Sequence, residues 1–391
     1  MKVTFRHPER VVEVAGSARV GDMLARLDIN PETVLVIYDR TLVTKDVVLP
    51  HDAHVEVRPV ISGGAGPAKC STCGITAVME VPRHRAAYCA DHFIDHVRSQ
   101  VRDAISRHDM LSYNDSILVA VSGGKDSMAL WDVLLDMGYR AAGLYLGLGI
   151  GEYSDRSADL VRAFAAQRGA TLHVVDLAEE YGYSIPEANG LRDRSSCGVC
   201  GLSKRYAFNR VALEYGYDVM ATGHNLDDEA AQLLGNVLRW QTPFMARQSV
   251  VLPATEAGMA RKVKPLYRLG EREMAAYCIV KGIDYVVEEC PMVGGNTVLR
   301  FKDALNELER HSPGTKAQFL FGFLDRVRPE FFEGADTAAK DLAACTSCGQ
   351  PTTSTHGAGE IVCAFCRTRT RVLHQNSRRE ASAALAHNAD V

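Results

Sequence analysis

The chain lacks any apolar run that approaches the roughly 20 residues needed to span a bilayer, so we expect no membrane partner. Its first residues, MKVTFRHPERVVEV, alternate and carry charge, and therefore lack the apolar core of a secretory signal. By default, this predicts a cytoplasmic protein. A basic excess is lacking too. The net charge is −4, so a nucleic-acid partner would have to be held by a local basic patch.

The cysteines do not have the arrangement expected of a disulfide framework. Eleven are present among 391 residues, and most fall in Cys-x-x-Cys or Cys-x-x-His pairs, which in a cytosolic chain indicate metal ligands or redox groups. Two four-ligand sets have the spacing of zinc ribbons, so we expect two structural Zn²⁺ ions. The sets are Cys70, Cys73, Cys89 and His92, and then Cys345, Cys348, Cys363 and Cys366.

The stretch SGGKDS follows an apolar strand at 117–121 and precedes a helix with apolar spacing at 128–135. A strand, a Gly-rich turn and a helix together aim backbone N–H groups and a helix N-terminus at phosphate. The loop is not a Walker A motif, because Asp126 follows Lys125 where that motif needs Ser or Thr. SGGKDS instead resembles the PP-loop of ATP pyrophosphatases, which cleave ATP between the α- and β-phosphates, and this resemblance implies an ATP site. Its residues are Ser122, Gly123, Gly124, Lys125, Asp126 and Ser127.

Strands and helices alternate over residues 105–335, which favours an α/β fold with a doubly wound parallel sheet. In such a sheet the ligand lies beyond the carboxyl ends of the strands. The rule brings together SGGKDS, the end of the strand at 141–146 and residues 223–228, which follow a strand at 218–222.

A triphosphate needs cationic contacts and usually Mg²⁺ held by carboxylates. We therefore name Lys125 and Lys204 as candidate cations, and Asp126 and Asp228 as candidate magnesium or positioning carboxylates. Asp227 stands where it could cap the following helix.

Three further cysteines have a different spacing from the zinc sets. Cys197 and Cys200 open a helix, and Cys290 stands far downstream. A redox pair, an incomplete zinc site and three ligands of an iron–sulfur cluster all fit this pattern. Three cysteines would leave one iron open, where a sulfide could bind. Cys278 lies in an apolar helix and is interpreted as a buried core residue.

Residues 1–64 have the order β-β-α-β-β and end in Gly63-Gly64, which resembles the ubiquitin-like β-grasp sulfur carriers. Those carriers end in Gly-Gly because a slim tail must enter an activating enzyme. Here residues 65–69 follow, so two interpretations stay open. The segment is either a fused carrier, cleaved after Gly64 or kept as a docking module, or a domain whose glycines simply begin a linker.

SGGKDS, CGVCGLSKRY, TGHNLDDEA and Cys290-Pro291 together resemble the tRNA 2-thiouridine synthetases of the TtuA-like group, over roughly residues 70–370. The resemblance implies that Cys197, Cys200 and Cys290 hold a 4Fe–4S cluster. It also implies that SGGKDS, Lys204 and Asp228 serve ATP, with Ala120, Leu146 and Gly223 lining the adenosine pocket.

The implied reaction adenylates the C2 oxygen of a uridine, T-loop ribothymidine or wobble uridine, and replaces it with sulfur. The cysteines, Asp126, Lys204 and Asp228 would be its catalytic residues. The implied partners are tRNA, a sulfur carrier with its activating enzyme, a cysteine desulfurase and a second copy in a homodimer.

The expected domains flank the catalytic core with zinc ribbons at 70–104 and 336–371, and a basic, Ala-rich tail at 372–391. Arginines from Arg367 to Arg379 could hold tRNA backbone, whereas a disordered tail is expected after about residue 376. Two other functions compete. A PP-loop sulfurtransferase or ligase for a small molecule would need no ribbons, and a zinc-ribbon RNA-binding scaffold would need no intact SGGKDS loop.

Overall fold

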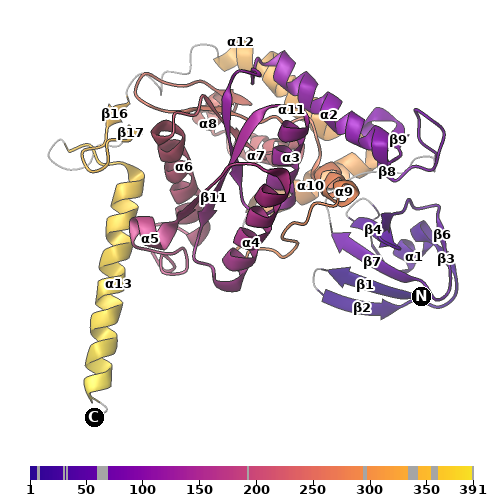
Figure 1. Ribbon diagram of the computed structural model, residues 1–391, viewed down its shortest axis with the longest axis horizontal. Coiled ribbons are helices and arrows are strands. Elements are labelled where there is room, and N and C mark those ends of the chain that lie inside the picture. Colours follow the sequence, from indigo (N-terminus) through magenta and orange to yellow (C-terminus); the bar gives the residue numbers. More distant parts are fainter. Residues whose placement is uncertain are drawn as a thin grey trace.

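The computed structural model describes the chain apart from residues 7–8, 30, 32–33, 60–68, 192, 294–296, 333–341, 354–359 and 390–391. A small N-terminal domain, a central α/β body and a C-terminal segment with a long helix follow one another across the molecule (Figure 1). No helix among the described residues is both long enough and apolar enough to cross a membrane.

The N-terminal domain is a five-stranded mixed sheet packed on one helix. The sheet order is β2-β1-β7-β4-β5, with β1 and β7 parallel and the other neighbours antiparallel. Met23 and Leu24 of the helix share a core with Val3 and Val57 of the sheet. The elements are β1 (Lys2–Arg6), β2 (Glu9–Glu13), β3 (Ala18–Arg19), α1 (Val20–Arg26), β4 (Val34–Tyr38), β5 (Thr41–Leu42), β6 (Val48–Leu49) and β7 (His54–Pro59). The predicted Gly63-Gly64 tail lies outside the described residues.

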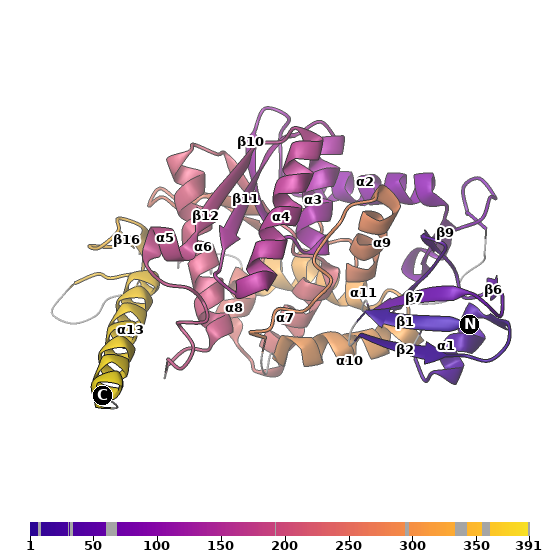
Figure 2. The ribbon, with the colours of Figure 1, turned by 60° about the horizontal axis from the view of Figure 1, so that its bottom comes forward.

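This domain docks on the central body rather than standing apart from it. Leu35, Ile37 and Leu42 belong to the same buried cluster as the core of the body. The side chain of Arg58 hydrogen-bonds with that of Tyr285. In Figure 2 the domain lies beside α9 (Glu271–Lys281). The contact face is apolar at its centre, and burial of such surface is the main force that holds it.

A short hairpin, β8 (Met79–Val81) and β9 (Ala86–Tyr88), begins the segment that follows, with a 3₁₀ turn at Pro82–His84 between its strands. It leads into α2 (Ala90–Arg107), whose apolar face packs Phe93, Val97 and Val101 into the main core. The helix thereby ties the first cysteine and histidine set to the central sheet.

The central sheet has the order β12-β11-β10-β13-β15-β14, and all of its neighbouring strands are parallel except β14 and β15. Helices cover both faces: Val119 of β10 faces the cluster that contains α3 and α9, whereas Leu118 faces Val211 of α6. This confirms the predicted doubly wound α/β fold. The strands are β10 (Ser116–Val121), β11 (Arg140–Gly147), β12 (Leu172–Asp176), β13 (Val219–Thr222), β14 (Val251–Leu252) and β15 (Arg261–Val263). The helices are α3 (Lys125–Asp136), α4 (Gly151–Arg168), α5 (Leu177–Tyr181), α6 (Ser196–Glu214), α7 (Leu226–Leu238) and α8 (Thr242–Arg247).

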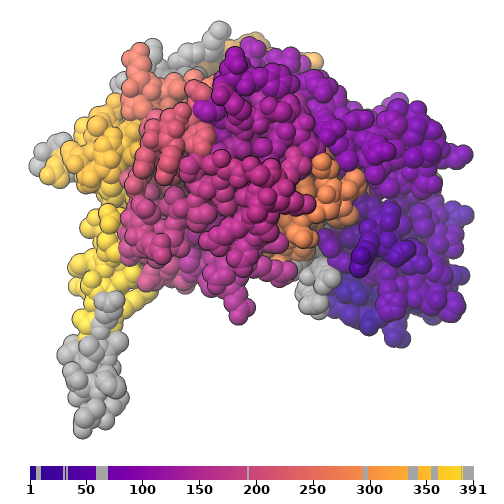
Figure 3. Space-filling view, viewed as in Figure 1, coloured from indigo at the N-terminus to yellow at the C-terminus, as the bar shows by residue number. Residues whose placement is uncertain are grey.

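Beyond α9 the chain continues through α10 (Thr297–His311), α11 (Thr315–Gly322), a π-helical turn at Phe323–Val327 and α12 (Arg328–Phe332). The C-terminal segment forms the hairpin β16 (Ala343–Ala344) and β17 (Pro351–Thr352), followed by α13 (Ala364–Ala389). This long helix projects from the body (Figures 1 and 3). The prediction of a disordered tail after residue 376 is therefore wrong for the described residues.

Candidate active site and metal centres

The SGGKDS loop joins the end of β10 to the start of α3, as the sequence predicts. Gly123 has a φ of +78°, and a Cβ there would lie 3.1 Å from the carbonyl oxygen of Ser157, so both backbone conformation and space favour glycine. The hydroxyl of Ser127 accepts a hydrogen bond from the Ser122 amide at 3.0 Å and donates to the Gly124 carbonyl at 2.9 Å. The loop is thus closed on itself, with the N-terminus of α3 at its side.

The end of β13 crosses the loop closely. A Cβ on Gly223 would lie 2.9 Å from the backbone carbon of Asp126 and the amide nitrogen of Ser127. Glycine at this position lets the β13 end and the loop share one edge of the sheet. The position of ligand sites in parallel sheets predicted that these two segments lie at the same edge, and this backbone contact confirms it.

A single cavity of about 880 Å³ lies at this edge. It contains most of the predicted nucleotide-site residues and also reaches the three cysteines outside the zinc sets. The predicted residues that line it are Ala120, Ser122, Gly124, Asp126, Ser127, Leu146, Cys197, Cys200, Lys204, Gly223, Asp228 and Cys290. The size suits a drug-sized or nucleotide-sized ligand.

Lys125 does not line the cavity as expected of a phosphate-binding cation. Its Nζ lies 2.6 Å from Oε1 of Glu271 and 3.2 Å from Oδ2 of Asp126. Burial lowers the pKa of Lys125, but the Asp126 and Glu271 carboxylates raise it further, so it lies well above its ordinary value. Lys125 is a charged lysine held by carboxylates beside the loop.

Lys302 makes the matching contact on the other side of Glu271. Its Nζ lies 3.0 Å from Oε2 of Glu271 and 2.6 Å from Oδ1 of Asp228. Burial raises the pKa of Glu271, yet Lys125 and Lys302 lower it more, and the balance is a pKa of about 2. The carboxylates of Asp126 and Asp228 are therefore linked through two lysines and one partly buried glutamate.

Asp126 has an environment unlike that of Glu271. Burial raises its pKa to about 6, with Glu271 and Asp228 adding to the rise and Lys125 opposing it. The side-chain amide of Asn225 donates to Oδ1 of Asp126 at 3.0 Å. Asn225 also accepts from the Asp228 amide at 3.0 Å, which makes it the N-cap of α7.

The predicted cap at Asp227 is wrong, because Asn225, two residues earlier, performs that role. Asp227 is instead almost fully buried. Its carboxylate accepts from the Glu271 amide at 2.8 Å and pairs with Lys316. Asp227 thus fixes the start of α9, where Glu271 stands.

The cysteine triad lines the cavity from two directions. Cys197 and Cys200 lie in the first turn and a half of α6, and the thiol of Cys197 approaches the carbonyl oxygen of Met292 at 3.7 Å, beside Cys290. The described residues contain two groups of ligands packed within 4.8 Å of one another, and the triad is not one of them. A single ion draws its ligands close, whereas a cluster spreads its thiolates over several irons. The wider spacing fits a cluster better than an incomplete zinc site.

Cys278 lies apart from the triad. Its side chain is completely buried in α9, and its thiol donates to the carbonyl oxygen of Lys125 at 3.4 Å. Burial raises its pKa well above the ordinary thiol value. It is a core residue behind the loop.

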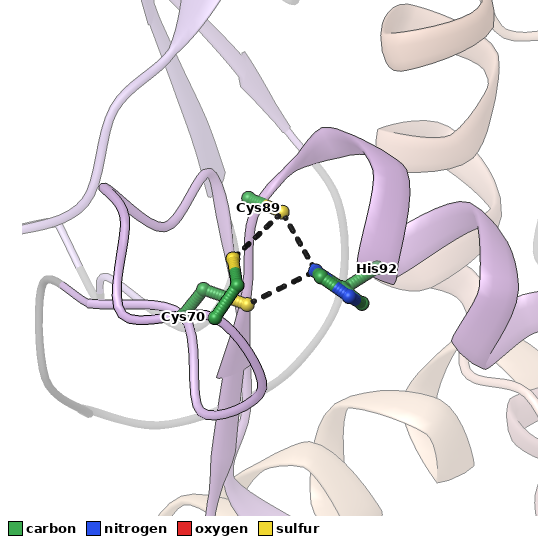
Figure 4. A group of neighbouring side chains, drawn as sticks. Cys70, Cys89 and His92 are labelled. Atoms are coloured by element: carbon green, nitrogen blue, oxygen red, sulfur yellow. Dashed lines mark hydrogen bonds between the residues drawn. The ribbon is translucent and has the colours of Figure 1, made fainter.

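The first predicted zinc set comes together, with its four ligand atoms within 4.8 Å of one another. Figure 4 shows the Cys70 and Cys89 thiols facing the ring of His92, with Sγ to Nδ1 distances of 3.6 and 3.1 Å. Burial raises the pKa of Cys70, but backbone amides from Cys89 and Cys73 lower it to about 6. A thiol that is readily ionised is a good ligand for Zn²⁺.

The second set also brings its four sulfurs within 4.8 Å. The amide of Cys363 donates to the thiol sulfur of Cys345 at 3.2 Å. Phe365 stands between the last two cysteines in the sequence. Its ring stacks on that of Tyr206, with the ring centroids 3.7 Å apart and an angle of 7° between the ring planes. Because Tyr206 belongs to α6, this ribbon packs on the helix that carries Cys197, Cys200 and Lys204.

The arginines of α13 are only partly available to a nucleic acid. Nε of Arg369 donates to the carbonyl of Tyr181 at 2.7 Å, and Arg379 donates to the carbonyl of Asn189 at 2.9 Å. Arg371 pairs with Asp193. Much of the predicted tRNA-binding segment therefore fastens α13 to the loop before α6.

Three charged residues beside the loop and cavity were not predicted as site residues: Lys264, Glu271 and Lys302. His224 lies within the predicted residues 223–228 but had no role assigned to it. His224 and Lys264 line the cavity. Burial and the nearby Lys264 lower the pKa of His224, which favours the neutral ring. Lys264 pairs with Glu229 at 2.8 Å. The only signal for these residues in the sequence was the position of His224 inside TGHNLDDEA.

Two family profiles match the chain. One, described as a PP-loop domain, covers residues 94–292. The other, described as the N-terminal LIM domain of the 2-thiouridine synthetase TtuA, covers residues 69–94. Residues 1–68 lie outside both matches.

Curated relatives are similar over most of their length. The tRNA-5-methyluridine(54) 2-sulfurtransferase of Thermus thermophilus is 48% identical over 311 residues, which are 80% of this chain and 94% of that protein. The protein of the same name from Pyrococcus horikoshii is 40% identical, over 76% of this chain and 93% of the relative.

A solved structure has the same fold. It is the U34-tRNA thiolase NcsA of Methanococcus maripaludis with its [4Fe-4S] cluster, with a TM-score of 0.65 and 24% identity over 78% of this chain and 96% of that one. These findings confirm the resemblance predicted from SGGKDS, CGVCGLSKRY and TGHNLDDEA, and the prediction of an enzyme. The chain belongs to the TtuA-like family of PP-loop tRNA sulfurtransferases.

Proposed function

We propose that the protein replaces the C2 oxygen of 5-methyluridine in the T-loop of tRNA with sulfur, at the expense of ATP. One observation carries this proposal: the SGGKDS loop and the Cys197, Cys200 and Cys290 triad line one cavity. The relatives named for position 54 support the choice of T-loop over wobble uridine. The similarity to this chain extends over more than nine tenths of the length of two of them.

The loop binds the triphosphate of ATP in this proposal. Its backbone amides and the N-terminus of α3 face the anion, and the cavity-lining Lys204 supplies positive charge. Asp126 and Asp228 are placed to hold Mg²⁺ against phosphate oxygens. Ala120, Leu146 and Gly223 line the same cavity and form the adenosine side.

Adenylation solves a specific chemical difficulty. The C2 carbonyl of uracil is a weak electrophile, and its oxygen is a poor leaving group. Transfer of AMP to that oxygen breaks the bond between the α- and β-phosphates and releases pyrophosphate. A sulfur nucleophile then adds at C2, and AMP departs with the oxygen. The loop amides, Lys204 and Mg²⁺ stabilise the charge on the departing pyrophosphate.

The triad fits an iron–sulfur group. Three thiols line one cavity, and residues of the SGGKDS loop line the same cavity. A 4Fe–4S cluster bound by Cys197, Cys200 and Cys290 would supply an open iron that holds the sulfide. Residues of the chain shield this side from water: Tyr153, Ile185 and Met292 line the cavity with the cysteines.

The two remaining ligand sets serve structure. Each has four ligands and so leaves no open position, which is the pattern of structural zinc. The first joins the segment before β8 to the start of α2, and the second packs against α6 through Tyr206 and Phe365.

For the N-terminal domain we propose a fused sulfur-carrier-like module. Its central parallel pair, β1 and β7, and the helix on one face support this role. Leu35, Ile37 and Leu42 bury part of its surface against the body, which favours the docking version over release. An activating enzyme, a cysteine desulfurase and a second copy of the chain complete the proposed cytoplasmic system.

Mass spectrometry of the protein from cells grown under sulfur demand tests the docking version. A fragment that ends at Gly64 would favour release of the domain over docking.

The proposal is tested with anaerobically purified protein, ATP, Mg²⁺, sulfide and tRNA. Cys197→Ala, Cys200→Ala and Cys290→Ala should each abolish thiolation and brown colour while leaving ATP binding intact. Cys278→Ala is the matched control, because Cys278 lies outside the cavity lining, and it should retain colour and activity. Full thiolation by all three triad variants contradicts the assignment.

A further inference from the structure

Trp240 occupies an unusual place between α7 and α8. Its exposed fraction is 77%, the highest among the exposed large apolar side chains of the described residues, and its φ is +50°. The Trp240 amide donates to the carbonyl of Val237 at 3.0 Å, and the Gln241 amide to that of Asn236 at 2.9 Å. These two bonds form a Schellman motif with Trp240 at the left-handed position, where glycine is usual. A bulky aromatic residue is thus held in water at a position that disfavours it.

Two further exposed apolar side chains, Leu238 and Phe244, lie within a few residues of Trp240. Basic groups accompany them: the guanidinium of Arg247 stacks over the Phe244 ring at 5.1 Å, and Arg239 is exposed. From residue 230 to 255 the sequence contains no Asp or Glu. We call Leu238, Arg239, Trp240, Phe244 and Arg247 the α7–α8 patch.

The patch borders the mouth of the cavity. Asn236 of α7 and Phe244 and Arg247 of α8 line the cavity itself, and the two helices adjoin (Figure 2). Trp240 lies in the turn between them. A ligand that enters the cavity with a polyanionic chain attached would pass this rim.

Aromatic rings with adjacent arginines are the usual means of holding splayed nucleic-acid bases. A base modified inside an enclosed site must leave its stack, and its unstacked neighbours then need a platform. A second copy of this chain would also cover apolar side chains. However, in a symmetric contact the patch would meet its own arginines in the second copy, with no acidic residue over 230–255 to offset them, whereas phosphate is complementary to this positive charge.

We propose that the α7–α8 patch is an RNA-docking platform, on which Trp240 stacks a base next to the uridine that enters the cavity. This inference rests on the proposed function, because it takes tRNA as the substrate. It adds a substrate-binding residue on the cavity rim, outside the nucleotide and cysteine sites.

Trp240→Gly separates binding from folding. Glycine is favoured at the left-handed position, so the melting temperature should stay equal or rise. Loss of one stacked base should raise the Kd and KM for tRNA roughly tenfold. ATP binding should not change. Trp240→Phe should restore most of the affinity, since a ring remains.

The control is Tyr215→Ala, which removes another exposed aromatic side chain at the far end of α6. Position 215 is about 28 Å along that helix from Ser196, and its loss should leave the Kd for tRNA unchanged. An unchanged Kd for tRNA in Trp240→Gly overturns the proposal. So does a change of oligomeric state at constant tRNA affinity, which would make the patch a contact between copies. Wild-type protein that binds no tRNA would instead refute the proposed function, and this inference with it.

Discussion

Nζ of Lys125 lies 2.6 Å from Oε1 of Glu271, a residue 146 positions further along the chain. The other oxygen of the same carboxylate accepts from Lys302 at 3.0 Å. Glu271 therefore sets the positions of two cations next to Asp126 and Asp228. It is a positioning residue for the nucleotide site, and its removal is expected to disturb charge balance more than shape.

Glu271→Gln should lower both stability and ATP affinity, because two partly buried ammonium groups lose their shared carboxylate. Breaking such a pair costs up to about 3 kcal/mol. Glu307→Gln is the control, since the pair of Glu307 with Arg310 is largely exposed and worth little. Chemical denaturation and calorimetric ATP titration measure both effects, and equal behaviour of the two variants would argue against the role of Glu271.

The same variant tests a pH dependence of stability. The folded-state pKa of Glu271 lies at about 2, below its ordinary value of 4.5. Its stabilising contribution is therefore present above pH 4.5 and is lost as the pH falls towards 2. The difference in melting temperature between wild type and Glu271→Gln should shrink across this range.

Activity should have an acid limb set by Asp126. Burial raises the pKa of this carboxyl group to about 6, and only the ionised form binds Mg²⁺ well. Consequently kcat/KM for ATP, which reports the free enzyme, should be full well above pH 6, fall to half near pH 6 and decrease further below it. A limb near pH 4, the ordinary carboxyl value, would contradict the structure.

Metal content gives an independent prediction. Wild-type protein should carry two zinc ions per chain, and Cys345→Ala only one, with a lower melting temperature because the packing of Phe365 on Tyr206 loosens. Cys278→Ala removes a buried thiol outside both sets and should keep two zinc ions. Elemental analysis decides, and an undiminished zinc content in Cys345→Ala would refute the second site.

Docking of the N-terminal domain can be tested by charge insertion. Ile37→Lys places an ammonium in the buried cluster shared with the body, so the domain should detach and the radius of gyration measured by X-ray scattering should increase. Val48→Lys is the control, because Val48 is exposed on the same domain. An unchanged radius in Ile37→Lys would show that the contact does not hold the domain.

The sequence predicted those parts of the site that depend on local motifs. Residue spacing alone identifies the SGGKDS loop, the two four-ligand sets and the cysteine triad. The rule that ligands bind at the carboxyl ends of parallel strands correctly placed residues 120–127 and 223–228 at one edge. Local patterns also fixed the alternation of strands and helices around β10 and α3.

Side-chain pairing over long distances was not predictable. The sequence around Lys125 does not indicate that its ammonium group pairs with Glu271. The sequence around Asp228 likewise does not indicate its pair with Lys302. Asp227 was predicted as a cap because Asp is common at the N-cap position of helices. Asn is equally common there, and Asn225 is the N-cap of α7. A disordered tail is expected after about residue 376 from its Ala content, yet the described residues there continue α13, since Ala is the strongest helix former.

The most direct test of the central claim is nucleoside mass spectrometry of tRNA from cells lacking this protein. In this tRNA 2-thiolated 5-methyluridine should disappear, and it should return with the wild-type chain but not with Asp228→Asn or Cys290→Ala. Unchanged thiolation of tRNA in the deletion strain would contradict the claim.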